Sequence, residues 1–292
     1  MLGDPRSDYA DLVCEDQNVQ AAMECITGFL RERDDWRRLV LRELVPDGHL
    51  CRDMQSAESR YLKCYWLDAS RCPGIDAKDA ADCFSRLARK KSLVRNDNGL
   101  QKVGDVRLDV LRSWPDIEPH LDDLFRQHIE RWNNIGQPSI YEKDEERLFC
   151  RLYTQGLAEA GLSHFSVLYC GDDVFAYHLG FDSNGTFTWY KPTFDWRYAK
   201  KSPGEVLIRR LLLHCDSADI EYFDFTRGME HFKQRFANNV VHNKTLIVFS
   251  SAWDALTYRA MAGIQKLPGV VSHAGKQLRK RIRNVLVTLG LR

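Results

Sequence analysis

A run of five residues, Lys200-Lys201-Ser202-Pro203-Gly204, stands where a predicted strand gives way to a predicted helix. The first turn of a helix has unpaired backbone N–H groups and carries the positive end of the helix dipole. Ser202 can cap this helix, Pro203 suits its first position, and Gly204 lets a ligand approach the backbone closely. With two lysines directly before it, the segment is a candidate cradle for a pyrophosphate. A plain capped helix would carry the same residues.

A second group of ionisable residues lies in the segment 223–236, FDFTRGMEHFKQRF. A predicted strand ends with Asp224 and Arg227, and the helix that follows carries Glu230 and Lys233. Aromatic neighbours indicate a partly buried Asp224 carboxyl. Burial raises the pKa of an unpaired carboxyl, whereas a neighbouring lysine or arginine lowers it. The alternative is an ion pair that only fixes the strand to the helix.

The elements predicted around these two groups form a mixed α+β sheet. Alternating apolar residues predict strands, and apolar residues at helical spacing predict helices. The expected strands are 104–111, 164–170, 174–181, 186–194, 220–227 and 244–250, and the expected helices are 115–132, 142–160, 202–215 and 229–236. This order implies an antiparallel meander followed by a strand–helix–strand unit.

The first hundred residues predict a helix from about residue 17 and strands at 36–44 and 60–70. Cys72-Pro73-Gly74 is expected to break the chain, and a charged helix at 78–94 is expected to end at the NDNG turn, 96–99. We therefore expect four parts. They are an N-terminal half-domain at 1–72, a linker helix at 73–103, a C-terminal domain at 104–252 and a basic helical tail at 253–292.

The composition is that of a globular protein. With 292 residues, 44% hydrophobic and 28% charged, the chain does not resemble a disordered or fibrous protein. No run reaches the roughly 18 apolar residues that a membrane-spanning helix needs. The N-terminus lacks a secretory pattern, and nine cysteines without a CxxC pair suit reduced thiols. We therefore expect a cytoplasmic protein, and the spacing of the histidines gives no reason to expect a metal.

Charge is distributed unevenly along the chain. The first 254 residues hold 34 basic and 41 acidic side chains, whereas residues 255–292 hold eight basic and no acidic ones. The net negative charge of the first 254 residues does not favour binding of nucleic acid, so nucleic acid is not an expected partner. The tail can form an amphipathic helix that docks on an anionic membrane surface or an acidic partner. Alternatively, its apolar side packs on the body.

The string SPGEVLIRRLLLHCDSADIEYFDFTRGMEHFKQRFAN, residues 202–238, resembles one family of GNAT-superfamily acetyltransferases. This is the family often labelled cellulose-biosynthesis protein (CelD-type, BioF2-like). Its members show a helix opened by Ser-Pro-Gly, a strand ending in Asp-Phe-x-x-Gly, and a helix with Tyr/Phe-Lys-x-Arg-Phe/Trp. Segments 130–141, 158–168 and 189–204 also match in order and spacing, so the resemblance covers about residues 70–250.

The resemblance implies a GNAT acyl-CoA N-acyltransferase fold, with a mixed, mostly antiparallel sheet flanked by helices. In this family the fold is duplicated, as in the Fem peptidoglycan-bridge ligases. Residues 7–13 resemble the middle of a first copy, so we expect a complete second copy and a partial first copy. We expect either a truncated start or a sheet edge that a partner covers, such as a second copy in a homo-oligomer, because an open apolar edge invites association.

The resemblance also implies a cofactor and roles for particular residues. Acyl-CoA, most simply acetyl-CoA, is the expected co-substrate, with its pyrophosphate at 202–204 and its acyl group beside 189–194. A lysine linked to the reacting carbonyl in the Fem ligases corresponds to Lys233. The usual GNAT loop, Q/R-x-x-G-x-G/A, is replaced here by Lys-Lys-Ser-Pro-Gly.

Direct attack of an amine on the thioester assigns the remaining roles. Asp224 or Glu230 is the candidate base, and Lys233 or a backbone N–H of 189–194 is the candidate donor to the oxyanion. Tyr190 is a candidate acid for the thiolate, or simply a strand aromatic. Three residues are candidates for binding the acceptor, a small-molecule or saccharide amine: Arg131, Trp132 and Arg227.

Two rival functions remain open. One is an aminoacyl-tRNA-dependent ligase of the Fem type. The other is a non-catalytic subunit of a polysaccharide-assembly system, which would keep the fold without the chemistry. An exopolysaccharide or cell-envelope role is implied by the family label alone.

Overall fold

The computed structural model describes residues 7–56, 63–78, 80 and 82–265. The chain divides into two compact units, Arg71–Val241 and a smaller one made of Met1–Ser70 with His242–Arg292. Two long strands, β2 (Lys63–Asp76) and β8 (Asn239–Phe249), contribute residues to both units. The predicted tail helix beyond Gln265 lies outside the described residues.

The larger unit is built on a mixed, mostly antiparallel sheet, which confirms the expected fold class. Its strands are ordered β2-β7-β6-β5-β4-β3. β3 (Val106–Leu111), β4 (Ser163–Cys170), β5 (Asp173–Ser183) and β6 (Thr186–Phe194) pair antiparallel as the predicted meander. The short β7 (Tyr222–Asp224) lies parallel to β6 and antiparallel to β2.

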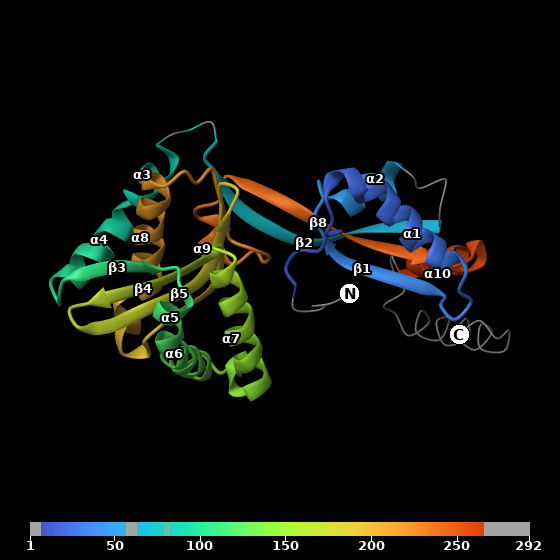
Figure 1. The fold of residues 1–292 in the computed structure, drawn as a ribbon. Helices are drawn as coiled ribbons and strands as arrows, with labels where there is room; N and C mark the ends of the chain where they lie inside the picture. The colour runs from blue at the N-terminus through green and yellow to red at the C-terminus, as the bar shows by residue number, and fades with distance from the viewer. Residues whose placement is uncertain (1–6, 57–62, 79, 81, 266–292) are drawn as a thin grey trace. The chain divides into compact units, whose positions relative to one another are not determined.

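Helices cover both faces of this sheet (Figure 1). One face carries α3 (Cys83–Ala88), α4 (Lys91–Gln101) and α8 (Pro203–Ser217), and the other carries α5 (Trp114–Ile117), α6 (Leu121–Asn134) and α7 (Asp144–Glu159).

The apolar face of α8 explains why this helix lies on the sheet. Its buried side chains pack in one cluster with strand aromatics such as Phe187 and Phe223. Burial of each large apolar side chain stabilises the fold by about 1.5–3 kcal/mol. This packing fixes the helix whose start forms part of the candidate site.

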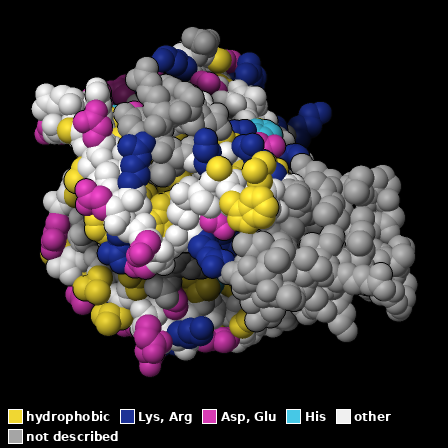
Figure 2. Space-filling view, turned by 90° about the vertical axis from the view of Figure 1, so that its right-hand side faces the viewer, with side chains coloured by type: hydrophobic (Ala, Val, Ile, Leu, Met, Phe, Trp, Pro, Cys, Tyr) yellow, Lys and Arg dark blue, Asp and Glu magenta, His cyan; other side chains and the backbone are white. Residues whose placement is uncertain are grey.

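The smaller unit contains α1 (Val19–Arg31), β1 (Arg38–Leu44), α2 (His49–Ser56) and α10 (Ala252–Gln265). β1 pairs antiparallel with β8. Figure 2, which looks onto the right-hand side of Figure 1, shows acidic and basic side chains interspersed among apolar ones on the described part of that face. None of the described helices is both long enough and apolar enough to cross a membrane.

Two predicted chain breaks are wrong. β2 continues through Cys72-Pro73-Gly74, because Gly74 is needed for close packing and not for a turn. A Cβ there would lie 2.0 Å from the hydroxyl oxygen of Tyr222. The NDNG sequence at 96–99 lies inside α4, because Asp97 of that sequence is buried and paired with two arginines of α8. Tertiary ion pairing thus overrides the local turn propensity.

Candidate active site

The ladder between β6 and β7 stops beside the start of α8. Pairing of β6 with β7 ends at Thr188 and Asp224, whereas β6 continues to Phe194 with β5 as its described partner on the other side. An extended ligand can add to a strand beyond the point where its ladder with a neighbouring strand stops. Because a helix between two parallel strands runs back along them, the first turn of α8 lies at the end of the sheet where β6 finishes.

The first turn of α8 carries the predicted anion-binding residues. Lys200 and Lys201 are exposed at the end of the 3-10 helix η4 (Trp196–Lys201). The predicted Ser202 cap is wrong: its side chain makes no capping bond, because its backbone is left-handed with φ 54°. The Gly204 amide has no acceptor among the described residues, and a Cβ there would meet nothing within 4 Å. The first turn therefore presents an open amide beside two cations.

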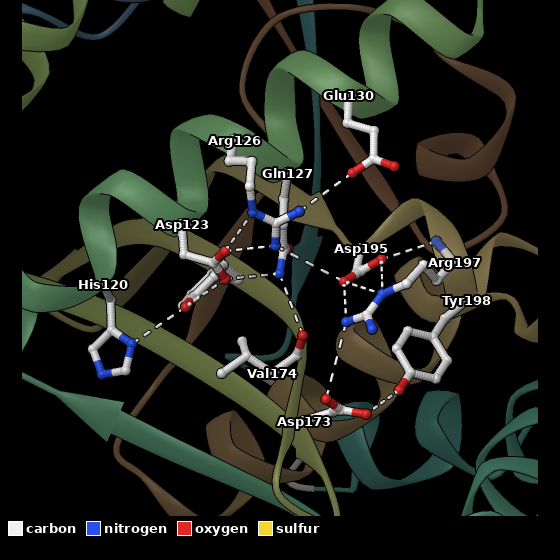
Figure 3. A network of polar contacts seen from close by, with 11 residues as sticks. His120, Asp123, Arg126, Gln127, Glu130, Asp173, Val174, Asp195, Arg197 and Tyr198 are labelled. Atoms are coloured by element: carbon white, nitrogen blue, oxygen red, sulfur yellow. Dashed lines mark hydrogen bonds and ion pairs between the residues drawn. The ribbon is translucent and has the colours of Figure 1, made fainter.

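A network of polar contacts holds η4 in place (Figure 3). Asp195, 1% exposed, accepts hydrogen bonds from the Arg197 backbone at 2.9 Å and from its guanidinium at 2.7–3.1 Å. Arg126 of α6 lies 3.9 Å from the same carboxylate. Burial opposes the charge on Asp195, but these arginines outweigh it and keep the pKa of the carboxyl below its ordinary value. The segment leading into α8 is therefore anchored to α6.

The structure brings Lys233, Glu230 and Arg227 together. Lys233, in α9 (His231–Gln234), is 5% exposed. Its Nζ donates to the Arg227 carbonyl oxygen at 2.8 Å and lies 3.0 Å from Oε2 of Glu230. Asp224 is 8% exposed at the end of β7, and its Oδ1 accepts from the Thr226 amide at 2.8 Å. The predicted strand alternation stops there because Thr226 is left-handed, with φ 58°.

A hydrogen-bonded ion pair joins this loop to the start of α8. Arg235 Nη1 lies 2.5 Å from Oε1 of Glu205, which belongs to the first turn of that helix. Asn96 of α4 donates to the other carboxylate oxygen of Glu205 at 2.6 Å. The two groups predicted from the sequence are thus neighbours in the fold.

Tyr190, Arg131 and Trp132 lie on the α6–α7 side of β6. The Tyr190 ring is 6.1 Å from the ring of Tyr153 on α7. Arg131 Nη1 donates to the Pro192 carbonyl at 3.0 Å, and burial lowers the pKa of this guanidinium. Trp132 stacks on a histidine of its own helix, at 5.6 Å between ring centroids. The predicted residues therefore form two groups, one around Lys233 and one along this side of β6.

Sequence reasoning missed a β-bulge in β6. Pairing shifts by one residue between Leu179 and Phe181, so Trp189 and Tyr190 lie opposite the single residue Gly180. Lys191 follows the bulge, with its Nζ 4.6 Å from the centroid of the Tyr190 ring. A glycine inside a predicted strand is the signal that could have revealed this bulge.

Buried histidines make the fold sensitive to acid. Burial lowers the pKa of His128 and of His164 to about 3, and that of His178 well below its usual value. Below pH ~6.5 the unfolded chain therefore binds more protons than the folded one. The free energy of unfolding is accordingly highest above that pH and falls as the pH is lowered.

We expect the free energy of unfolding to fall by about 2 kcal/mol per buried histidine between pH 6.5 and 5. Urea unfolding at several pH values measures this slope. In the variant His164→Gln, the free energy of unfolding should fall less steeply with decreasing pH, by the contribution of one histidine. An unchanged slope in this variant would contradict the assignment of His164 as neutral in the folded state.

The described residues contain no group of three or more His, Cys, Asp or Glu side chains that could hold a metal ion. All nine cysteines are free thiols. The geometry combines an open helix start, a strand that continues past the end of its ladder with β7, and a buried lysine paired with Glu230.

The chain is similar to a known protein family and to several solved structures. The model of the acetyltransferase (GNAT) domain family matches residues 88–234. No curated protein matches the sequence. Among solved structures, FemX is similar with a TM-score of 0.59 and 7% identity, covering 85% of this chain and 81% of FemX.

Two further solved structures have the same fold. The C-terminal domain of a putative lysylphosphatidylglycerol synthetase from Agrobacterium fabrum has a TM-score of 0.57 and 13% identity, with 86% of this chain and 79% of that one covered. L-PGS from Bacillus licheniformis has a TM-score of 0.54 and 13% identity, with 84% and 78% covered. At these identities the likeness is one of fold.

Proposed function

Because the chain belongs to the acetyltransferase (GNAT) domain family, we propose that it transfers an acyl group from acyl-CoA to an amine. The observation that carries the proposal is the end of the β6–β7 ladder beside the open first turn of α8. In the proposed complex with acyl-CoA, the extended arm of CoA pairs with segment 189–194. Its pyrophosphate meets the Gly204 amide, with Lys200 and Lys201 nearby.

The acceptor must be deprotonated before it attacks. A lysine-like amine of pKa ~10.4 costs roughly 4.6 kcal/mol to deprotonate at pH 7. Asp224 and Glu230 are the candidate bases. Glu230 is 55% exposed, whereas Asp224 is almost buried at the end of β7.

The amine nitrogen then attacks the thioester carbonyl carbon and forms the new C–N bond. The oxyanion that develops needs a hydrogen-bond donor, for which Lys233 and the backbone of 189–194 are the candidates. As the tetrahedral intermediate collapses, the C–S bond breaks and the thiolate takes up a proton. Tyr190 is the candidate proton donor, and Arg131, Trp132 and Arg227 are the candidate acceptor-binding residues.

Reversing the charge of the two exposed lysines tests donor binding. We expect Lys200→Glu with Lys201→Glu to raise the Kd for acetyl-CoA about tenfold, because two exposed cations facing a diphosphate contribute up to about 1 kcal/mol each. The effect should shrink as salt is added. Isothermal titration calorimetry measures both changes.

The matched control is Lys102→Glu with Lys143→Glu, which makes the same charge change at two exposed lysines of the same unit. Its Kd should stay at the wild-type value. Equal weakening in both double variants would show only a general electrostatic effect. No heat with the wild type would refute acyl-CoA binding and favour the non-catalytic subunit.

We keep the Fem-type ligase as the rival donor chemistry, because FemX is among the similar folds. The acidic balance of residues 1–254 argues against an RNA-binding surface on that part of the chain. Binding of an aminoacyl-tRNA that weakens steeply with salt, together with no binding of acetyl-CoA, would favour this rival.

The finer assignments rest on sequence motifs. The Ser-Pro-Gly and Asp-Phe-x-x-Gly strings support the CelD-type, BioF2-like grouping and, through its label, a saccharide amine acceptor in exopolysaccharide or envelope synthesis. The basic tail supports peripheral binding to an anionic membrane from the cytoplasmic side.

A further inference from the structure

The bulge in β6 is held by a side chain, as well as by the strand ladder. The backbone N–H of Tyr190 donates to Nε2 of His178 on β5, at 3.3 Å. A backbone N–H can only donate, so Nε2 accepts, and the proton of the neutral ring lies on Nδ1. At the point where the ladder is interrupted, the imidazole nitrogen thus accepts the hydrogen bond that a backbone carbonyl oxygen would otherwise accept.

Three features fix the His178 ring in this role. Its side chain is fully buried and stacks between Trp189, at 4.9 Å, and Phe187, at 5.2 Å. Gly180 leaves the room that the ring occupies, since a Cβ there would lie 2.2 Å from Cε1 of His178. Gly180 is also the residue opposite the bulge.

The buried imidazole has an energetic cost. Nδ1 of His178 is buried and has no hydrogen-bond partner among the described residues. A buried polar group without a partner is destabilising, and an apolar ring would fill the same stack without that cost. The benefit that the imidazole offers in exchange is an acceptor for the Tyr190 amide.

The surroundings keep the ring neutral. His164 of β4 faces it at 6.3 Å between ring centroids, and the other rings packed on it are apolar. Ser166 of β4 and His214 of α8 contact His164. Burial holds the pKa of His178 well below its usual value, so Nε2 can accept at neutral pH.

We propose that His178 is a positioning residue for acyl transfer, which holds the Tyr190 amide and thereby fixes segment 189–194 where the acyl carbonyl is to be bound. This inference rests on the proposed function. The inference goes beyond the proposed function because it assigns the geometry of segment 189–194 to His178 on the neighbouring strand β5.

Two variants separate the acceptor from the ring. His178→Phe keeps an aromatic ring in the stack and removes the acceptor, whereas His178→Gln keeps an acceptor oxygen. Binding of acetyl-CoA and of CoA is measured by calorimetry, because only acetyl-CoA has the carbonyl that the segment would hold. We expect the wild type to prefer acetyl-CoA, His178→Phe to bind it about tenfold more weakly with CoA unchanged, and His178→Gln to keep the preference.

The control is His164→Gln, which removes the neighbouring buried histidine and should keep the preference for acetyl-CoA. Wild-type preference in His178→Phe would overturn the inference and leave the proposed function standing. Failure of the wild type to bind either compound would instead refute the proposed function.

A second measurement does not depend on the His178 variants folding. With ¹⁵N-tyrosine labelling, and Tyr190 assigned by the resonance lost in Tyr190→Phe, the Tyr190 amide of the wild type should exchange slowly with solvent. Fast exchange of this amide in the folded wild type would overturn the inference.

Discussion

The variant Lys233→Ala should release CoA from acetyl-CoA about 10²–10³-fold more slowly than the wild type, with kcat reduced and the fold retained. A single donor to the oxyanion typically contributes that much to the rate. Lys233 is almost fully buried, with Glu230 at 3.0 Å, so its removal also leaves that carboxylate without its cation. The measurement is steady-state CoA release with an amine acceptor, beside a thermal unfolding curve.

Lys244→Ala is the matched control, because Lys244 makes a comparable ion pair with Asp68, at 2.8 Å, in the smaller unit. It should leave kcat unchanged. A wild-type rate in Lys233→Ala would remove this lysine from the mechanism. A lost rate together with a lost fold would assign Lys233 to the structure of the loop.

Asp97→Ala is expected to lower the free energy of unfolding by about 3–5 kcal/mol, because removing one partner of a buried ion pair leaves the others without compensation. Asp97 is 1% exposed, and both Arg209 and Arg210 of α8 bond to its carboxylate. The ion pairs join α4 to the helix that begins at the candidate anion site. Urea unfolding monitored by tryptophan fluorescence measures the change.

An exposed pair provides the comparison. Asp122 is 84% exposed and lies 2.5 Å from Arg151, and exposed ion pairs contribute about 0–1 kcal/mol. Asp122→Ala should therefore change the unfolding midpoint little. Equal losses in the two variants would mean that burial of Asp97 does not set its contribution.

Local patterns predicted the meander and the crossover helix well. β4, β5 and β6 lie within two residues of the expected strands, because each is an apolar run bounded by turn residues. The helix at 202–215 was also found, since its apolar residues recur at helical spacing and Pro203 opens it. These signals depend only on neighbours in the sequence.

Features set by distant contacts were not predictable. Gly74 resembled a turn residue, yet it lies in a strand because the Tyr222 ring needs the space. The NDNG sequence resembled a turn, yet Asp97 meets arginines more than a hundred residues away. The Lys233 contacts likewise depend on which segments become neighbours. Gly180 is a local signal for a bulge, but the residues that lie opposite it depend on which strand pairs with β5.

The ion pair between Arg235 and Glu205 ties the first turn of α8 to the segment that follows Lys233. We expect an acyl donor that binds at this turn also to shift the lysine loop. Thermodynamic reciprocity then requires that an acceptor settling at the loop change the affinity for the donor by the same factor. We expect removal of this ion pair to weaken that coupling without abolishing it, because Phe225 and Phe236 also pack in one cluster with α8.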